Sequence, residues 1–224
     1  FLSRRHAEGG WAANCTLIVA ADRFVQAPGG PLESSYLDAS AADLAVTLGA
    51  RALKLLVLWE AGATNDEQVE MVEAFIAVAR ERRLLTIVEG IVRVTGHPGP
   101  APAAALIEAA ARLSVGADIY KAQVPIHGGD RPADVESLSR ELTAAIDCPW
   151  VVLSAGVPAE RFPELVAASC RGGASGFLAG RAVWGASLRA DDPPRDLLER
   201  AAPGLRALAA VVDRNARPWR EATG

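Results

Sequence analysis

The stretch Leu53–Trp59 (LKLLVLW) is a strand-length apolar run that is interrupted only by Lys54. Five further runs rich in Val, Ile and Leu share this character, and the starts of the six lie about 26–37 residues apart. They are Thr16–Asp22, Leu85–Val92, Asp118–Val124, Trp150–Ser154 and Gly176–Ala179. This spacing is typical of one strand followed by one helix. We therefore expect strand and helix to alternate along the chain.

Helical periodicity fills the intervals between these runs. The expected helices are Asp66–Arg82, Ala101–Leu113, Ala133–Ala145 and Pro163–Arg171, and a long amphipathic stretch, Pro194–Asn215, is split at Pro203-Gly204. Unbroken apolar strands joined by helices indicate a parallel sheet covered on both faces, either a barrel or an open doubly wound sheet. The absence of a GxGxxG or Walker pattern weakens the nucleotide-binding open sheet.

Six units are too few to close an eight-stranded barrel, but the first residues suggest that the chain begins inside a unit. Phe1–Glu8 (FLSRRHAE) is typical of the end of a helix, and Gly9-Gly10 of its terminator. We therefore expect an α/β fold, a (β/α)8 TIM barrel, with about six of the eight strand-helix units present. Residues 1–224 would form a single domain that lacks its first two units.

Composition excludes several classes of function. Half of the 224 residues are apolar, the formal net charge is −4, and the 23 Lys and Arg residues are scattered, which argues against nucleic-acid binding. No apolar run reaches the ~18–20 residues of a membrane helix. The three cysteines and three histidines have neither metal-site nor disulfide-framework spacing. We expect a cytoplasmic protein with no metal or other cofactor.

Lys121 is the first candidate catalytic residue. In Ala117–Pro125 (ADIYKAQVP), strand alternation places Lys121 on one face with Ile119 and Gln123. A lysine inside an apolar strand is costly to bury as a cation, and the neutral amine is the nucleophile that a Schiff base requires. The alternative is a lysine at the sheet edge whose aliphatic stem lies along the surface.

Two more ionisable residues interrupt the preceding strands. Lys54 lies in LKLLVLW and Glu89 in Ile87–Arg93 (IVEGIVR). A second ammonium favours the neutral form of the first, and a carboxylate transfers protons. The alternative is that each is a salt-bridged barrel residue without a catalytic role.

The last two units suggest a phosphate site. Val152–Val157 (VLSAGV) and Gly176–Ala182 (GFLAGRA) end in small residues that allow close approach of an anion to the backbone, and the second adds Arg181. Loops after the last two strands of such barrels commonly bind phosphate. Alternatively, the glycines serve turns and Arg181 pairs with a carboxylate.

These segments, in the same order, resemble class I aldolases of the family that contains tagatose-1,6-bisphosphate aldolase and sulfofructosephosphate aldolase. The resemblance rests on LKLLVLW, IVEGIVR, ADIYKAQVP, PWVVLSAGV and GASGFLAGRAVW. LKLLVLW and GASGFLAGRAVW are closer to the sulfosugar branch. Gln123, where a glutamate is common, and the tail ARPWRE, which resembles the tagatose branch, depart from that pattern.

The resemblance implies that Lys121 forms the Schiff base and that Glu89 and Lys54 assist proton transfer. It also implies that Ser154, Gly156, Gly180 and Arg181 hold a phosphate. Arg93 is a candidate contact for the distal anion of the substrate. The expected partner is a small-molecule sugar phosphate, and the family implies a homo-oligomer.

The expected reaction is cleavage of a ketose 1-phosphate to dihydroxyacetone phosphate and an aldehyde. The preferred substrate is 6-deoxy-6-sulfofructose 1-phosphate, which gives 3-sulfolactaldehyde; tagatose 1,6-bisphosphate, which gives glyceraldehyde 3-phosphate, is the alternative. An isomerase or epimerase barrel and a non-catalytic phosphosugar-binding barrel are the rival classes of function.

Overall fold

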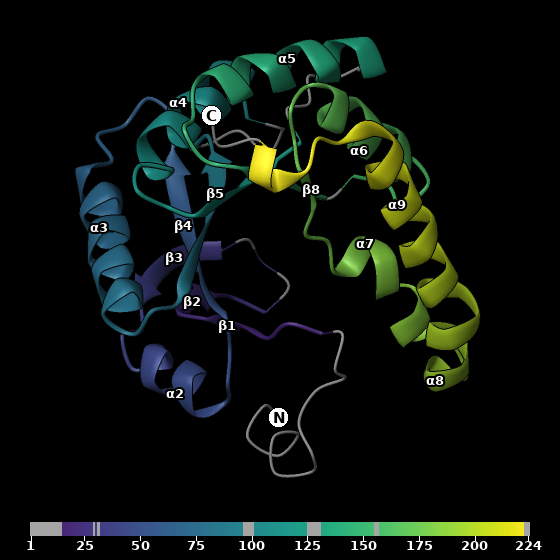
Figure 1. Cartoon of the computed structure of the whole chain (residues 1–224), viewed down its shortest axis with the longest axis horizontal. Helices are drawn as coiled ribbons and strands as arrows, with labels where there is room; N and C mark the ends of the chain where they lie inside the picture. The colour runs from purple at the N-terminus through teal and green to yellow at the C-terminus, as the bar shows by residue number, and fades with distance from the viewer. Residues whose placement is uncertain are drawn as a thin grey trace.

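Six parallel strands form the central sheet of the protein in the computed structural model (Figure 1), which describes residues 15–28, 30, 32–95, 101–124, 131–154 and 157–221. The strands are β1 (Ile18–Ala20), β4 (Ala52–Glu60), β5 (Leu85–Arg93), β6 (Ile119–Gln123), β7 (Trp150–Leu153) and β8 (Gly176–Phe177). Each strand pairs with the next of these strands along the chain, in the order β1-β4-β5-β6-β7-β8. All six expected strand segments are confirmed.

The sequential strand order decides between the two parallel architectures. A doubly wound sheet reverses its strand order at a switch point, whereas a barrel adds each strand to the same edge. Here the sheet curls into an open arc with α3 (Asp66–Glu81), α4 (Ala103–Leu113), α5 (Pro132–Ala144) and α6 (Phe162–Arg171) along its outer side (Figure 1). The barrel-type α/β fold is therefore confirmed, and these helices lie within one or two residues of the expected ranges.

Strand alternation divides the sheet into an outer and an inner face. In β4, Leu53, Leu55, Val57 and Trp59 are fully buried in the hydrophobic core. Lys54 and Leu56, on the opposite face, are only partly buried. The inner face therefore carries the ionisable side chains, whereas the outer face is the apolar surface that the helices cover.

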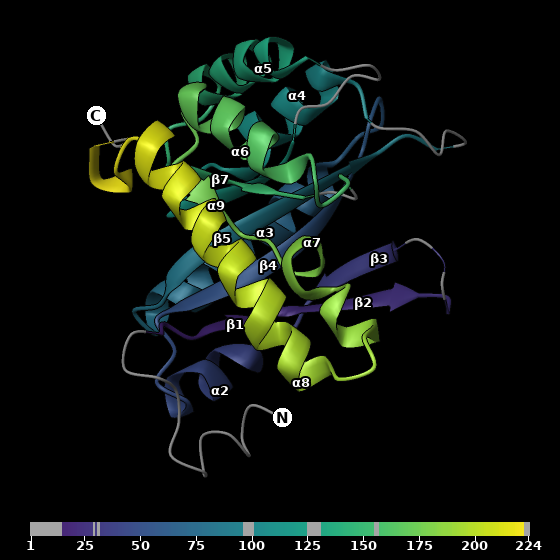
Figure 2. The same cartoon turned by 90° about the vertical axis from the view of Figure 1, so that its right-hand side faces the viewer.

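A two-stranded antiparallel hairpin, which the sequence patterns do not indicate, follows β1. It consists of β2 (Asp22–Gln26) and β3 (Leu32–Leu37), and α2 (Ala41–Thr47) leads from it to β4. The expected first strand, Thr16–Asp22, is shorter in the structure because the chain leaves the main sheet at Ala21, before Asp22 begins the hairpin. Figure 2 shows the hairpin beside the main sheet, where it contacts β4. The short helix α7 (Arg181–Trp184) follows β8.

The C-terminal helical stretch is not split at Pro203-Gly204. It comprises α8 (Pro193–Asp196), a π-helical turn η2 (Leu197–Ala201) and α9 (Ala202–Asn215), followed by a 3-10 turn η3 (Trp219–Glu221). Pro203 lies in the first turn of α9, where a missing backbone N–H is tolerated, and the irregular π turn η2 ends at Ala201. The irregularity therefore precedes the proline, and the helix continues through Gly204.

Gly90 on the outer face of β5 makes room for the Tyr120 hydroxyl. A Cβ atom at this position would lie 2.1 Å from Tyr120 Oη, and Tyr120 is almost fully buried. We expect Gly90→Ala to lower the free energy of unfolding by about 1–3 kcal/mol, the usual cost of overpacking a core. The measurement is urea unfolding, with Gly204→Ala as the control because a Cβ there meets no atom within 4 Å. Equal stability of the two variants would contradict this packing.

Among the described residues, no helix is long and apolar enough to cross a membrane. The expected helix end at Phe1–Glu8 and its terminator Gly9-Gly10 lie outside the described residues, as do the three histidines.

Candidate active site

Lys121 and Glu89 lie opposite each other on the inner face of the sheet. The pairing of β5 with β6 places Glu89 in register with Lys121, and paired residues of parallel strands project from the same face. Lys121 Nζ lies 2.8 Å from Glu89 Oε1. The two side chains are 16% and 9% exposed, so the ion pair is largely withdrawn from water. A carboxylate thus lies within proton-transfer distance of the amine.

Lys54 and Asp22 extend this pair into a row of alternating charges. Lys54 Nζ lies 3.3 Å from Glu89 Oε2 and 2.8 Å from Asp22 Oδ1. Asp22 is 3% exposed and also accepts a hydrogen bond from the backbone N–H of Leu56. Glu89 therefore lies between two ammonium groups, and Asp22 holds the second one from the opposite side. Removing any member leaves an uncompensated, mostly buried charge.

The full sequence contains only two lysines, Lys54 and Lys121, and all its other Lys/Arg cations are arginines. A guanidinium remains protonated in proteins, whereas a lysine amine can lose its proton and act as a nucleophile. The chain thus places its only two side-chain amines within reach of the same carboxylate, Glu89. This distribution favours amine chemistry over a general need for positive charge.

A cavity of about 930 Å³ opens over Lys121, at the carboxyl end of the strands. Glu89, Lys121 and Gln123 line it on the sheet side. Gln123 Oε1 accepts a hydrogen bond of 2.7 Å from the backbone N–H of Val92, which fixes the amide against β5. The cavity is large enough for a drug-sized or sugar-sized ligand.

Three of the four residues that were expected to bind a phosphate line the same cavity. These are Ser154 after β7, and Gly180 and Arg181 after β8. The Trp184 ring packs against Gly180, where a Cβ atom would lie 3.2 Å from Trp184 Cζ2, so a larger residue would displace the ring. The fourth residue, Gly156, lies outside the described residues. The structure therefore brings an arginine and small residues to the cavity that Lys121 faces.

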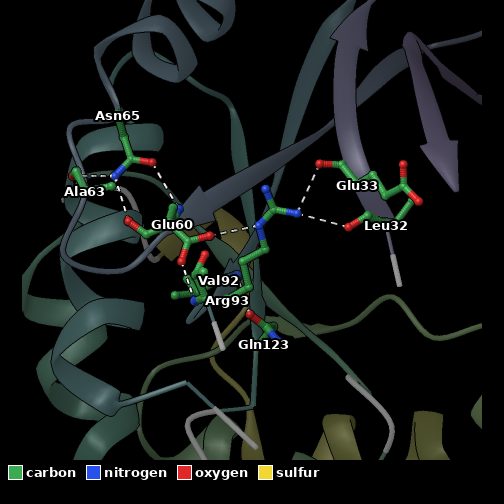
Figure 3. Close-up of polar contacts among 9 residues, drawn as sticks. Leu32, Glu33, Glu60, Ala63, Asn65, Val92, Arg93 and Gln123 are labelled. Atoms are coloured by element: carbon green, nitrogen blue, oxygen red, sulfur yellow. Dashed lines mark hydrogen bonds and ion pairs between the residues drawn. The ribbon is translucent and has the colours of Figure 1, made fainter. Parts of the chain in front are cut away.

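Arg93 is held away from this cavity by other contacts (Figure 3). Its Nε atom lies 3.0 Å from Glu60 Oε2, and its Nη1 atom donates to the backbone oxygens of Leu32 and Glu33 at 3.0 and 3.1 Å. It lines a separate cavity of about 370 Å³ between the hairpin and β4. The structure does not bring Arg93 together with Lys121, and its contacts instead attach β3 to the ends of β4 and β5.

Hydrogen bonding to Thr95 holds the pKa of Glu60 below its usual value, with a smaller effect of Arg93, while burial opposes both. Glu60 thus stabilises the folded state above its unfolded-state pKa, and this stabilisation is lost as pH falls through the lower folded-state pKa. We expect Arg93→Ala to cost about 1 kcal/mol of unfolding free energy at neutral pH, and less below the pKa of Glu60. Urea unfolding at several pH values measures this. A loss that grows on acidification would contradict it.

Two residues of the site were not identified as candidates from the sequence. Asp22 ends an expected strand, and only the fold shows that it contacts Lys54. Trp184 is 39% exposed and lines the cavity, whereas Trp59 and Trp150 are buried in the core. Within the described part of the chain, no group of three or more His, Cys, Asp or Glu side chains could hold a metal ion.

The fold and the site together define a barrel-type α/β protein with a lysine–carboxylate pair in its cavity. Residues 3–186 match the model of the DeoC/LacD family aldolases, so the chain belongs to this family of carbon–carbon lyases. A tagatose 1,6-diphosphate aldolase of Streptococcus pyogenes serotype M1 is 30% identical over 125 residues, covering 47% of this chain and 38% of that protein. The matched region thus spans less than half the length of the streptococcal enzyme.

Solved structures support the fold. An archaeal fructose 1,6-bisphosphate aldolase is similar with a TM-score of 0.66 and 21% identity, covering 94% of this chain and 81% of that one. A fructose-bisphosphate aldolase from Slackia heliotrinireducens has a TM-score of 0.66 and 20% identity, covering 95% of this chain and 70% of that one. At this level of identity the likeness concerns the fold.

Proposed function

We propose that this chain is a class I aldolase that cleaves a ketose 1-phosphate to dihydroxyacetone phosphate and an aldehyde, with Lys121 as the Schiff-base lysine. The observation that carries the proposal is the Lys121 amine, 2.8 Å from a carboxylate and facing a cavity lined by Arg181. Membership of the DeoC/LacD aldolase family supports the same reaction class.

The reaction begins with attack of the neutral Lys121 amine on the C2 carbonyl carbon of the ketose. Loss of water gives an iminium ion, which accepts electrons from the C3–C4 bond. Glu89, directly or through a water molecule, removes the proton of the C4 hydroxyl as that bond breaks and the aldehyde leaves. The resulting enamine is protonated at C3, and hydrolysis of the iminium releases dihydroxyacetone phosphate and the free amine. These steps use no metal or other cofactor.

The other residues of the site bind and orient. Lys54 lies 3.3 Å from the second oxygen of Glu89 and assists its proton transfer, while Asp22 holds Lys54 in place. Arg181, Ser154 and Gly180, which line the cavity, anchor the C1 phosphate, and the family resemblance assigns Gly156 to the same role. Binding energy from a phosphate remote from the reacting bond then places C2 against Lys121.

The finer identity of the substrate has two candidates. The strand motifs LKLLVLW and GASGFLAGRAVW favour 6-deoxy-6-sulfofructose 1-phosphate, which gives 3-sulfolactaldehyde. The streptococcal relative, named a tagatose 1,6-diphosphate aldolase, favours tagatose 1,6-bisphosphate, which gives glyceraldehyde 3-phosphate. Turnover of both substrates under one set of conditions separates the candidates. Much faster cleavage of tagatose 1,6-bisphosphate would overturn the sulfosugar preference.

Borohydride trapping tests the reaction class. Dihydroxyacetone phosphate and borohydride should give a reduced adduct on Lys121, located by peptide mass spectrometry. The assignment is unambiguous because Lys54 is the only other lysine in the chain. An adduct on Lys54 would reassign the nucleophile, and no adduct at all would overturn the class I mechanism.

A further inference from the structure

Arg189 is a second arginine in the wall of the Lys121 cavity. It ends the short 3-10 helix η1 (Ser187–Arg189), eight residues after Arg181. Both arginines line the cavity, together with Trp184 and Ala186 from the segment between them. The segment that follows β8 therefore contributes two cations to the cavity lining, of which the proposed C1-phosphate site uses one.

Neither of these two guanidinium groups has a carboxylate partner among the described residues. Most other arginines of that part of the chain are ion-paired: Arg23, Arg82, Arg93, Arg112, Arg131, Arg140, Arg171, Arg195 and Arg200. Glu160 also lines the cavity but forms no ion pair with either arginine. Arg181 and Arg189 therefore keep their donors available for a ligand, and a planar guanidinium can bind a phosphate or sulfonate through two hydrogen bonds.

The positions of the two arginines suit a ligand with two anionic groups. Arg181 lies four residues after the end of β8 and lines the cavity with the proposed phosphate residues Ser154 and Gly180. Arg189 lies eight residues farther along the chain, at the end of η1 and after the turn that follows α7, so the two guanidinium groups come from different elements. Arg93, the sequence candidate for a distal anion, is bound to Glu60 and lines another cavity.

We propose that Arg189 determines substrate specificity by binding the second anionic group of a doubly charged ketose, the phosphate or sulfonate at C6, while Arg181 binds the phosphate at C1. This inference rests on the proposed function, because it requires a phosphosugar in the Lys121 cavity. It predicts preference for substrates that carry an anion at both ends over ketose 1-phosphates that lack the distal group. It also assigns no role in the chemical step to Arg189.

Calorimetric binding of two unreactive analogues tests this assignment. Hexitol 1,6-bisphosphate and hexitol 1-phosphate lack the carbonyl that a Schiff base needs, so their affinity does not depend on Lys121 chemistry. Arg189→Ala should weaken binding of the bisphosphate about 10- to 100-fold, the usual value of a charge-assisted contact. The same variant should change binding of the monophosphate by less than about threefold. The matched control is Arg195→Ala, which should change neither affinity. Arg195 lies on the neighbouring α8 and forms an ion pair with Glu199.

The other outcomes are distinct. Equal loss for both analogues would place Arg189 at the C1 phosphate and overturn the proposal, as would unchanged affinity for both. Selective loss for the bisphosphate in Arg93→Ala, but not in Arg189→Ala, would return the distal site to Arg93. Failure of the parent protein to bind either analogue would reject a phosphosugar site altogether. Normal analogue binding without borohydride trapping would instead overturn the aldolase mechanism and leave the role of Arg189 intact.

Discussion

Lys121→Arg is expected to lower kcat for ketose 1-phosphate cleavage by at least about 10⁴-fold and to abolish borohydride trapping. Arginine keeps a positive charge near Glu89, 2.8 Å from the present amine, but its guanidinium cannot lose a proton and add to a carbonyl. The measurement is single-turnover cleavage together with mass spectrometry of the trapped protein.

The matched comparison is Lys54→Arg, which changes the only other lysine of the chain. It should lower the rate as well, because Lys54 contacts Glu89, but should still give the reduced adduct on Lys121. Unchanged turnover in Lys121→Arg would favour the rival classes, an isomerase or a binding barrel, because neither needs a lysine nucleophile.

Glu89→Gln is expected to lower kcat by about 10²- to 10⁴-fold, the usual contribution of general acid–base catalysis. Glutamine has nearly the same shape but cannot accept the proton of the C4 hydroxyl. It also leaves Asp22 as the only carboxylate in the row that contains both ammonium groups. Steady-state cleavage and equilibrium unfolding of the same variant are the two measurements.

The control for Glu89→Gln is Glu136→Gln, which removes a carboxylate paired with Arg140 and Arg171 on the outer helices. Its kcat should equal that of the parent protein. If Glu89→Gln kept full activity while losing stability, the carboxylate would be structural, and a water or another group would have to act as the base. Loss of activity without unfolding supports the assigned proton transfer.

Sequence periodicity was sufficient for the strands and the outer helices because it reports local burial. An apolar run such as Leu53–Trp59 must be buried in any stable fold of the chain. The helices α3 to α6 each have an apolar stripe that faces the core. The hairpin was not predicted because the residues of β2 and β3 are exposed or only partly buried. Strands that contribute little to the core lack the apolar signal on which such predictions depend.

Local sequence patterns were enough to predict the parallel α/β fold and the presence of Lys54, Glu89 and Lys121 within strands. Alternation within a strand fixes which face a side chain occupies, but not which residue it meets on the next strand. Only the tertiary structure set the register that brings Lys121 to 2.8 Å from Glu89 and Asp22 to 2.8 Å from Lys54. The tertiary structure also shows that Arg93 is paired with Glu60 and that Arg189 lines the cavity. Such contacts depend on how segments far apart in the sequence pack together, and a local sequence pattern does not specify which of their residues meet.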